Sequence, residues 1–401
     1  MRSSRYKITI PYIVSFLFPF AIWLSNFDFF NSGITIGDII LIVCLLLSLT
    51  YSKNNEYKNN ETRWIALCIF AQLLISAVAL LATEHVFWDS VIKRSIKLII
   101  YTIAVFRLRN RIDIKTSIHS FEVFLYITTF GIIIQYAVYY IFGSVINVIR
   151  LPLLRYPDSY FTESFNSNFR PSSIFLEPAH LTQFTIPIIV IELFKSDKKA
   201  LFKGLIFSFA CVLTTSGTAI FVVSSIWILY IIIKSKESFK SFVRTVIIVI
   251  MISLLVFFVY NNIPSVQFAI ERLSESDSAV YSGRLYNGDY LTKQMTNLEK
   301  IIGVGFGNVD MSIYMSSARY IYYSGGVIVS ILWIALVIYL LVKEKIIGKI
   351  VIICFVALCF SSRIFLSMSM CYYLLFCIIS YDSEILHSPK NDNRNCTIKK
   401  H

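Results

Sequence analysis

The chain has 401 residues, of which 56% are hydrophobic and 15% charged, and its mean hydropathy is +0.69. A soluble domain carries much more polar surface, so this composition excludes one and indicates a membrane protein. The formal charge of +13 would suggest nucleic acid in a soluble protein, but these cations lie between apolar stretches, which argues against a nucleic-acid partner.

Apolar stretches follow one another along the chain, each roughly 17 to 24 residues long, which is about the length that a helix needs to cross a bilayer. They do not alternate as barrel strands do. The predicted fold is therefore all-α, a single-domain polytopic membrane protein with about 12 transmembrane helices. The expected spans cover residues 8–24, 33–50, 64–82, 88–106, 118–142, 179–194, 203–216, 218–233, 245–262, 320–342, 346–360 and 364–380.

The distribution of positive charge predicts how these spans are oriented. If the N-terminus is cytoplasmic, 25 of the 37 Lys and Arg fall in loops and tails on that side, and the opposite side carries far fewer. Cytoplasmic loops of membrane proteins carry this excess. We therefore expect an uncleaved first helix, a cytoplasmic N-terminus and a cytoplasmic tail over residues 381–401.

Two pairs of apolar stretches are separated by very short turns. The first pair is split at Thr215-Ser216-Gly217-Thr218, which predicts a tight hairpin between two short helices. The second pair, residues 346–360 and 364–380, turns at Ser361-Ser362-Arg363 and forms either two spans or one re-entrant unit. A re-entrant unit would move the C-terminus to the other side, and the basic tail argues against that.

Two loops on the outward side are long, residues 143–178 and 261–319, while every other outward loop is short. Irregular segments of this length in a compact protein are more often functional than accidental, so we expect the chemistry on these two loops. Most of the cysteines lie inside apolar stretches and no CxxC pair occurs, so neither a metal site nor a disulfide is indicated.

The first long loop ends in Arg170-Pro-Ser-Ser-Ile-Phe-Leu-Glu177-Pro178-Ala-His180 and runs directly into a span. Proline is favoured at the first helical position, so Pro178 is expected to open the helix and to place Glu177 and His180 in its first turn. Partial positive charge at this helix end disfavours a histidine cation, so His180 would be neutral and able to act as a general base. The alternative is that Glu177 caps the helix and pairs with Arg170, leaving His180 as a polar residue at the lipid boundary.

Three cations lie inside the span expected at residues 88–106. Lys93, Arg94 and Lys97 stand at i, i+3 and i+4 spacing, so pairs of them share a helix face. Cations within a membrane are costly and face a polar cavity or a counter-ion. They either reach to the outer interface along their apolar stems or converge with Arg170 and Arg284 on a diphosphate.

The second long loop holds Tyr281-Ser-Gly-Arg284, the glycine-rich run Ile302-Gly303-Val-Gly305-Phe-Gly307-Asn308, and Arg319 before the next span. No strand precedes the glycine run and no GK[ST] follows it, so a nucleotide-binding loop is not indicated. The glycines are expected to let the backbone approach a ligand or another helix closely. Arg284 either clamps an anion through two N–H groups or is a solvated surface charge.

Four of these segments resemble the bacterial O-antigen and capsular polysaccharide polymerase family, a group related to O-antigen ligases. They are the segment from Arg170 to His180, the hairpin Thr214-Thr-Ser-Gly-Thr, Ser282-Gly-Arg284, and the glycine run at 302–308. The resemblance covers roughly residues 165–330, and the flanking spans agree in number and hydropathy. The hairpin departs from the family, because it has Gly217-Thr218 where relatives commonly carry an arginine.

The resemblance implies a glycosyltransferase of the bacterial inner membrane, which moves a growing glycan from undecaprenyl diphosphate onto a lipid-linked repeat unit at the outer face, with inversion at the anomeric carbon. The implied catalytic residues are His180 or, failing that, Glu177 as the base, together with Arg170 and Arg284. The implied substrate-binding residues are Lys93, Arg94, Lys97, Arg319 and Asn308. The activated sugar–diphosphate bond supplies the energy, so no cofactor and no metal is expected.

The expected partners are the undecaprenyl-diphosphate-linked oligosaccharide and membrane lipid, with a chain-length regulator and a flippase as candidates. Three other functions stay open. An O-antigen ligase would use similar residues but a lipid A core acceptor. A repeat-unit flippase also has about twelve spans but needs paired halves with charges at the membrane midplane, whereas polar residues here gather on two loops. A structural scaffold would be insensitive to loss of the arginines or the histidine.

Overall fold

The structure, a computed structural model, describes residues 9–28, 33–50, 60–83, 85–146, 169–195, 198–235, 288–310 and 315–379, with the isolated positions 243, 247, 261 and 313. Within these residues the chain is helical, and the one strand-like contact is an isolated antiparallel bridge between Asp28 and Thr35. The predicted all-α fold class is therefore confirmed. The tail at 381–401, most of both long loops and the span expected at 245–262 lie largely outside the described residues.

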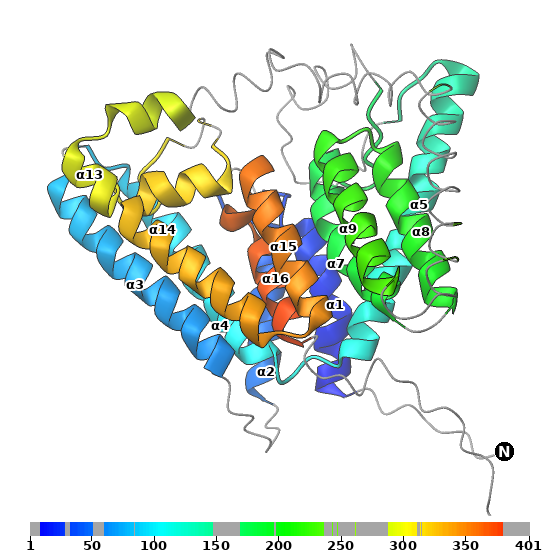
Figure 1. Ribbon diagram of the computed structural model, residues 1–401, viewed down its shortest axis with the longest axis horizontal. Helices are drawn as coiled ribbons and strands as arrows, with labels where there is room; N and C mark the ends of the chain where they lie inside the picture. The colour runs from blue at the N-terminus through cyan, green and yellow to red at the C-terminus, as the bar shows by residue number, and fades with distance from the viewer. Residues whose placement is uncertain are drawn as a thin grey trace, which may run out of the picture.

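The helices follow the order shown in Figure 1. The first group comprises α1 (Ile10–Leu24), α2 (Ile36–Leu49), α3 (Asn60–Ala82), α4 (Trp88–Leu108), α5 (Ile114–Phe142), α7 (Pro178–Phe194), α8 (Lys198–Leu213) and α9 (Gly217–Ser235). The second group comprises α13 (Asn297–Ile302), α14 (Ser317–Lys343), α15 (Ile346–Ser361), the short 3-10 helix η1 (Ile364–Leu366) and α16 (Met368–Ile379). The tight hairpin predicted at 215–218 is present as the turn between α8 and α9.

Four of these helices, α3, α5, α9 and α14, are long and apolar enough to cross a membrane. Five more are apolar but shorter: α1, α2, α7, α15 and α16. A helix rises about 1.5 Å per residue, so α16 is roughly 18 Å long, well short of a hydrocarbon core of about 30 Å. The chain is thus built as a helical membrane protein, and the number of twelve crossing helices stays a prediction.

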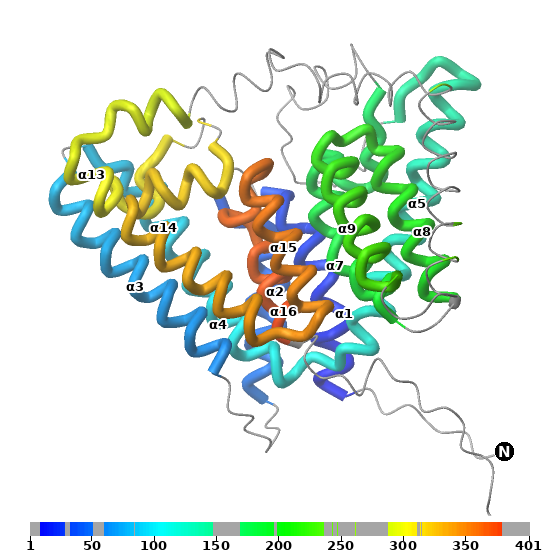
Figure 2. Tube along the Cα trace, in the orientation of Figure 1, coloured from blue at the N-terminus to red at the C-terminus, as the bar shows by residue number. Residues whose placement is uncertain are grey.

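Two helices, α7 and α16, form the centre of the bundle. α16 is buried from Met368 to Ile378 and packs against α1, α4, α7 and α15. In the tube drawing of Figure 2 it lies in the middle of the bundle. α7 is buried from Leu181 to Phe194. Its apolar residues are distributed around the whole circumference, as in a helix that is surrounded by protein. The Tyr372 ring of α16 stacks on the Phe121 ring of α5 with centroids 4.8 Å apart.

Consecutive helices run in opposite directions, so their connections gather at two ends of the bundle. At the end drawn uppermost in Figure 1, α3 and α5 finish while α4, α7, α9 and α14 begin. We call this the upper end and the opposite one the lower end; the charge distribution predicts that the upper end faces outward. The predicted site residues that the structure describes lie at the upper end or in the first ten residues of a helix that begins there.

Candidate active site

The first turn of α7 places the predicted base at the upper end. α7 begins at Pro178, as predicted, with Glu177 as its N-cap residue, but the Glu177 side chain makes no capping hydrogen bond. The Glu177 carboxylate lies beside the His180 ring instead, with Oε2 3.9 Å from Nε2. The other ring nitrogen, Nδ1, is buried and has no hydrogen-bond partner among the described residues. A histidine that holds no structural hydrogen bond through Nδ1 is available for proton transfer.

The turn before α7 is fixed to two other helices. The Ser173 N–H donates to Oε1 of Gln135 in α5 at 2.8 Å. The indole N–H of Trp23, at the end of α1, donates to the carbonyl of Ile174 at 3.0 Å. These bonds hold the half-buried Arg170 and the start of α7 in a defined position relative to α5 and α1.

The three cations of α4 have different partners. Nζ of Lys93 lies 2.8 Å from Oδ2 of Asp89 in an exposed pair one turn apart. Nζ of Lys97 lies 2.9 Å from Oδ2 of Asp38 at the start of α2. Carboxylates of the chain therefore balance both lysines, and a diphosphate would have to compete with them. This leaves Arg94 as the strongest anion-binding candidate of the three.

Arg94 is held against an aromatic ring of α14. Its Cζ lies 5.7 Å from the centroid of the buried Tyr320 ring, a cation–π contact. The Tyr320 hydroxyl in turn accepts the N–H of Gly307 at 2.7 Å. Nη1 of Arg94 is buried and, in the part of the chain that the structure describes, has no hydrogen-bond partner. A buried guanidinium N–H without an acceptor is costly, and an anionic ligand would remove that cost.

The glycine run packs its backbone onto three helices. Gly303, Gly305 and Gly307 have φ values of 80°, 98° and 85°, in the left-handed region that favours glycine. A Cβ at these positions would lie 2.3, 2.6 and 2.6 Å from atoms of α14, α3 and α4 respectively. The prediction of close backbone approach is confirmed, and within the described residues the approaching element is a helix.

Asn308 closes the glycine run onto the connection between α3 and α4. Its Oδ1 accepts the N–H of Phe87 at 2.9 Å, and its Nδ2 donates to the carbonyls of Val304 and His85 at 3.0 and 3.3 Å. The side chain is 4% exposed, and both ends of its amide are occupied. Asn308 thus holds this part of the upper end together, and its role in substrate binding stays a prediction.

The predicted residues form two groups at the upper end. The α4 group contains Lys93, Arg94, Lys97, Asn308 and Arg319, and the α7 group contains Arg170, Glu177 and His180. Arg319, in the first turn of α14, pairs with Asp289 at 2.8 Å. α16 packs against both α4 and α7 and so lies between the groups. Arg284 lies outside the described residues, and a single pocket that joins the two groups remains a prediction.

Sequence analysis missed the acidic partner of Lys97. Asp38 caps α2 together with Thr35, and its Oδ1 accepts the hydroxyl of Tyr101 at 2.7 Å. The spacing of Thr35 and Asp38 matches a capping pattern that could have located the start of α2. The pairing with α4 joins residues far apart in the sequence and has no local signal.

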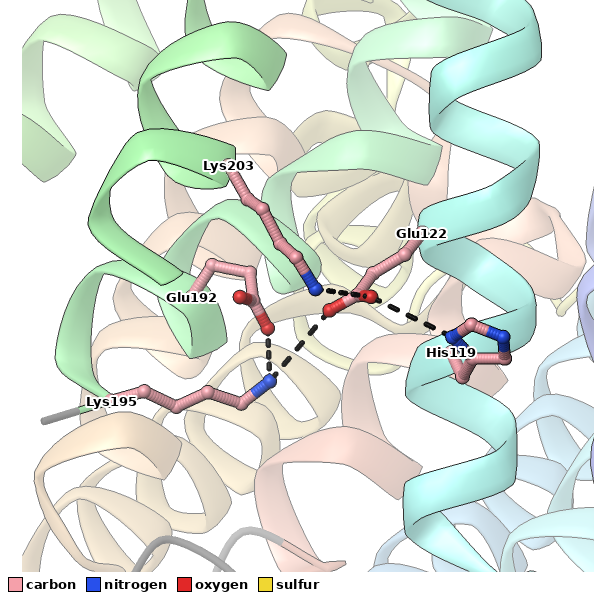
Figure 3. A network of polar contacts seen from close by, with 5 residues as sticks. All are labelled: His119, Glu122, Glu192, Lys195 and Lys203. Atoms are coloured by element: carbon pink, nitrogen blue, oxygen red, sulfur yellow. Dashed lines mark hydrogen bonds and ion pairs between the residues drawn. The ribbon is translucent and has the colours of Figure 1, made fainter. Parts of the chain in front are cut away.

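A second cluster of charges, shown in Figure 3, was also missed and lies at the lower end. Lys203 of α8 lies 2.6 Å from Glu122 of α5, and Lys195 lies 3.9 Å from Glu122 and also pairs with Glu192 of α7. The ring of His119 lies 3.9 Å from Glu122. The signal was present, because acids inside the expected spans at 118–142 and 179–194 require counter-ions.

One buried acid titrates far from its ordinary range. Glu344 lies in the turn between α14 and α15 at the lower end, is 3% exposed, and has a carboxylate oxygen, Oε2, without a hydrogen-bond partner. Burial, together with the nearby charge of Glu61, raises the pKa of Glu344 to about 8 against the opposing effect of Arg109. Among the described residues no group of three or more His, Cys, Asp or Glu is placed to hold a metal ion.

The upper end therefore combines a proton acceptor beside a carboxylate with a buried guanidinium that has an unused N–H group. Neither a protein-family model nor a curated protein matches this chain. The likeness of its four segments to the polysaccharide polymerases rests on their residues alone.

Proposed function

We propose that this chain is a glycosyltransferase that polymerises a lipid-linked glycan at the outer face of the bacterial inner membrane. The observation that carries the proposal is the His180 ring, which lies beside Glu177 and has an unpartnered Nδ1, at the same end of the bundle as the unused N–H of Arg94. The resemblance to polysaccharide polymerases supplies the substrate class, an undecaprenyl-diphosphate-linked oligosaccharide.

The proposed reaction is a direct displacement at the anomeric carbon. The acceptor hydroxyl gives its proton to His180 as its oxygen forms the new glycosidic bond, and the bond from the anomeric carbon to the diphosphate oxygen breaks. Glu177, 3.9 Å from the ring, stabilises the imidazolium that forms. Arg94, with Arg170 and Arg284, takes up the negative charge that develops on the leaving diphosphate. Attack from the opposite face inverts the anomeric configuration.

The asymmetry of charge supports an outward-facing site. The lower end carries the excess of Lys and Arg expected of cytoplasmic loops, while the upper end carries the proposed machinery. Undecaprenyl diphosphate keeps its chain in the bilayer, so we expect its diphosphate at the membrane surface, where the proposed orientation would bring the first turns of α4 and α7.

The test is complementation of a strain that lacks the gene. His180→Ala, Arg94→Ala, Arg170→Ala and Arg284→Ala are each expressed at matched membrane levels, and the length of the surface glycan is measured. The expected result is glycan limited to one repeat unit, because proton transfer or leaving-group stabilisation is lost; single donors of this kind contribute about 100-fold or more to rate.

The matched control is Arg107→Ala, an exposed arginine near the lower end of α4, which is expected to restore full-length glycan. Full-length glycan from all four test variants would refute the assignment. Polymer that forms but is not transferred to lipid A core would indicate a ligase, and complete loss of outward-facing repeat units would indicate a flippase.

A further inference from the structure

Two residues with strained backbones stand out at the upper end. Among the described residues, Ser173 and Thr215 are the two that are not glycine yet have positive φ, at 54° and 55°. A side chain in this region costs about 1 kcal/mol or more, and a β-branched residue such as threonine is a true outlier there. Such strain persists where the surroundings impose it, and it concentrates at functional sites.

Thr215 lies where glycine is the usual residue. α8 ends at Leu213, and a left-handed residue just beyond a helix is most often glycine. The N–H of Thr215 donates to the carbonyl of Val212 at 3.0 Å, so the turn itself needs only the backbone. The Thr215 side chain is 4% exposed, and its hydroxyl has no hydrogen-bond partner within the described ranges. The turn is therefore strained by a side chain whose hydroxyl stabilises none of the described residues by a hydrogen bond.

Ser173 repeats this combination in the turn before α7. Ser172 closes the turn, with its carbonyl accepting the Phe175 N–H at 3.0 Å and its hydroxyl donating to the Phe175 carbonyl at 2.7 Å. Ser173 is 6% exposed, and none of the described residues forms a hydrogen bond with its hydroxyl. A Cβ on Gly131 of α5 would lie 2.2 Å from this hydroxyl oxygen, so the missing side chain at Gly131 leaves the space that the hydroxyl occupies.

The two hydroxyls are carried by neighbouring parts of the bundle. The backbone N–H of Ser173 donates a hydrogen bond to Gln135 of α5. The hydroxyl of Tyr136, the next residue of α5, donates to the carbonyl of Leu213 at 2.7 Å, two residues before Thr215. His180 begins α7, which packs against both α5 and α8. The unpartnered atoms of Ser173, Thr215 and His180 thus belong to the upper ends of three helices in mutual contact.

We propose that the hydroxyls of Ser173 and Thr215 bind the sugar ring of the acceptor beside His180, an inference that rests on the proposed function. Serine and threonine hydroxyls and a neutral imidazole each donate and accept hydrogen bonds, which suits the hydroxyl groups of a sugar. A diphosphate is instead suited to the guanidinium of Arg94. On this assignment the acceptor sugar lies at α5, α7 and α8, and the leaving diphosphate lies between Arg170 and Arg94 of α4.

The test uses Ser173→Gly and Thr215→Gly, which remove the hydroxyl and relieve the backbone strain together. The assay measures chain extension by the purified full-length protein in vesicles, with two probes added separately as inhibitors. The first probe is the oligosaccharide that mild acid releases from lipid-linked repeat units of the deletion strain. The second probe is undecaprenyl diphosphate. Each glycine variant is expected to bind the oligosaccharide about tenfold more weakly, the loss of one hydrogen bond, with inhibition by undecaprenyl diphosphate unchanged. Melting temperatures are expected to equal or exceed that of the wild type.

The controls separate binding from folding. Thr215→Ser keeps the hydroxyl and is expected to retain wild-type affinity for the oligosaccharide, and Ser144→Ala removes an exposed hydroxyl at the same end. Unchanged affinity in both glycine variants, equal weakening of the two probes, or a lower melting temperature with retained affinity would overturn the proposal and leave these hydroxyls as structural groups.

If the wild-type protein makes no polymer, the proposed function fails and the sugar site is tested separately. The measurement is then the rise in melting temperature caused by the same oligosaccharide. A rise in the wild type that both glycine variants lack supports the site, and the absence of a rise in the wild type refutes it.

Discussion

Buried carboxyl groups in this protein differ in how the cost of their burial is compensated. Asp38 is buried but accepts hydrogen bonds from Thr35 and Tyr101 and pairs with Lys97, so its cost is offset locally. Glu344 is equally buried and has a carboxylate oxygen without a hydrogen-bond partner. A group in that situation keeps its proton, which links the stability of the fold to pH.

We predict that Glu344 makes the protein less stable as the pH rises. Its pKa is raised from the ordinary value of 4.5 to about 8, so the folded state keeps a proton that the unfolded chain releases above pH 4.5. The stability it contributes is present below pH 4.5 and is lost progressively up to pH 8. Glu344→Gln is therefore expected to raise the melting temperature clearly at pH 8.5 and to change it little at pH 4.5.

The matched control is Glu344→Asp, which keeps a carboxyl group and should keep the pH dependence. Thermal unfolding of the purified protein in detergent, followed at several pH values, measures both variants. An equal shift of the glutamine variant at every pH would show that packing, and not titration, is responsible.

Among the helices and loops, the glycine run is the element that most constrains the candidate site. It fills the space between α3, α4 and α14, and α14 itself is kinked at Gly326, where φ is 63°. The carbonyls of Tyr323 and Ser324 before this kink accept the N–H groups of Val304 and Gly305, each at 3.0 Å. The loop thereby satisfies backbone groups that a broken helix would leave exposed.

We predict that Gly307→Ala disrupts the α4 group. A methyl group there would lie 2.6 Å from a backbone atom of α4, and φ is 85°, so the loop must move away from α4. This movement breaks the hydrogen bond from the Gly307 N–H to Tyr320 and displaces the ring beneath Arg94. The expected loss is about 3 kcal/mol of stability together with most of the polymerising activity.

Gly143→Ala is the control for the backbone effect alone. Gly143 ends α5 with φ 60°, and a Cβ there would meet nothing within 4 Å. It is expected to cost about 1 kcal/mol and to leave glycan length unchanged. If both variants behaved alike in stability and glycan length, the contact with α4 would be unimportant.

Local patterns predicted the elements, and contacts between distant residues determined their roles. Pro178 opens α7 and the turn after Leu213 is tight because proline and short polar turns act within a few residues. Lys97 pairs with Asp38 and Arg94 lies against the ring of Tyr320, and both of these partners are on other helices. Likewise, the burial of α7 and α16 follows from their packing and could not be predicted from sequence. An apolar segment has the same sequence pattern whether it faces lipid or protein.

Considered as one body, the molecule has two unlike ends, and its orientation in the membrane can be tested directly. We predict that Ser144→Cys, exposed at the upper end, reacts with a membrane-impermeant maleimide added to intact spheroplasts. Lys345→Cys, exposed in the turn between α14 and α15, is expected to react only after the membrane is permeabilised.

The seven cysteines in the described part of the chain are all buried, so the background is low, and the wild-type protein measures what remains from Cys396. The reverse pattern of labelling would place the candidate site in the cytoplasm and contradict the proposed substrate.

The complete enclosure of α7 has a consequence for how the protein responds to its bilayer. From Leu181 to Phe194 the helix is buried, and its lower end is tied through Glu192 and Lys195 to α5. A thicker or thinner bilayer acts on helices that face its acyl chains, chiefly by changing their tilt. α7 has no such face, so His180 keeps its depth relative to the core while the peripheral helices adjust to the surrounding lipid.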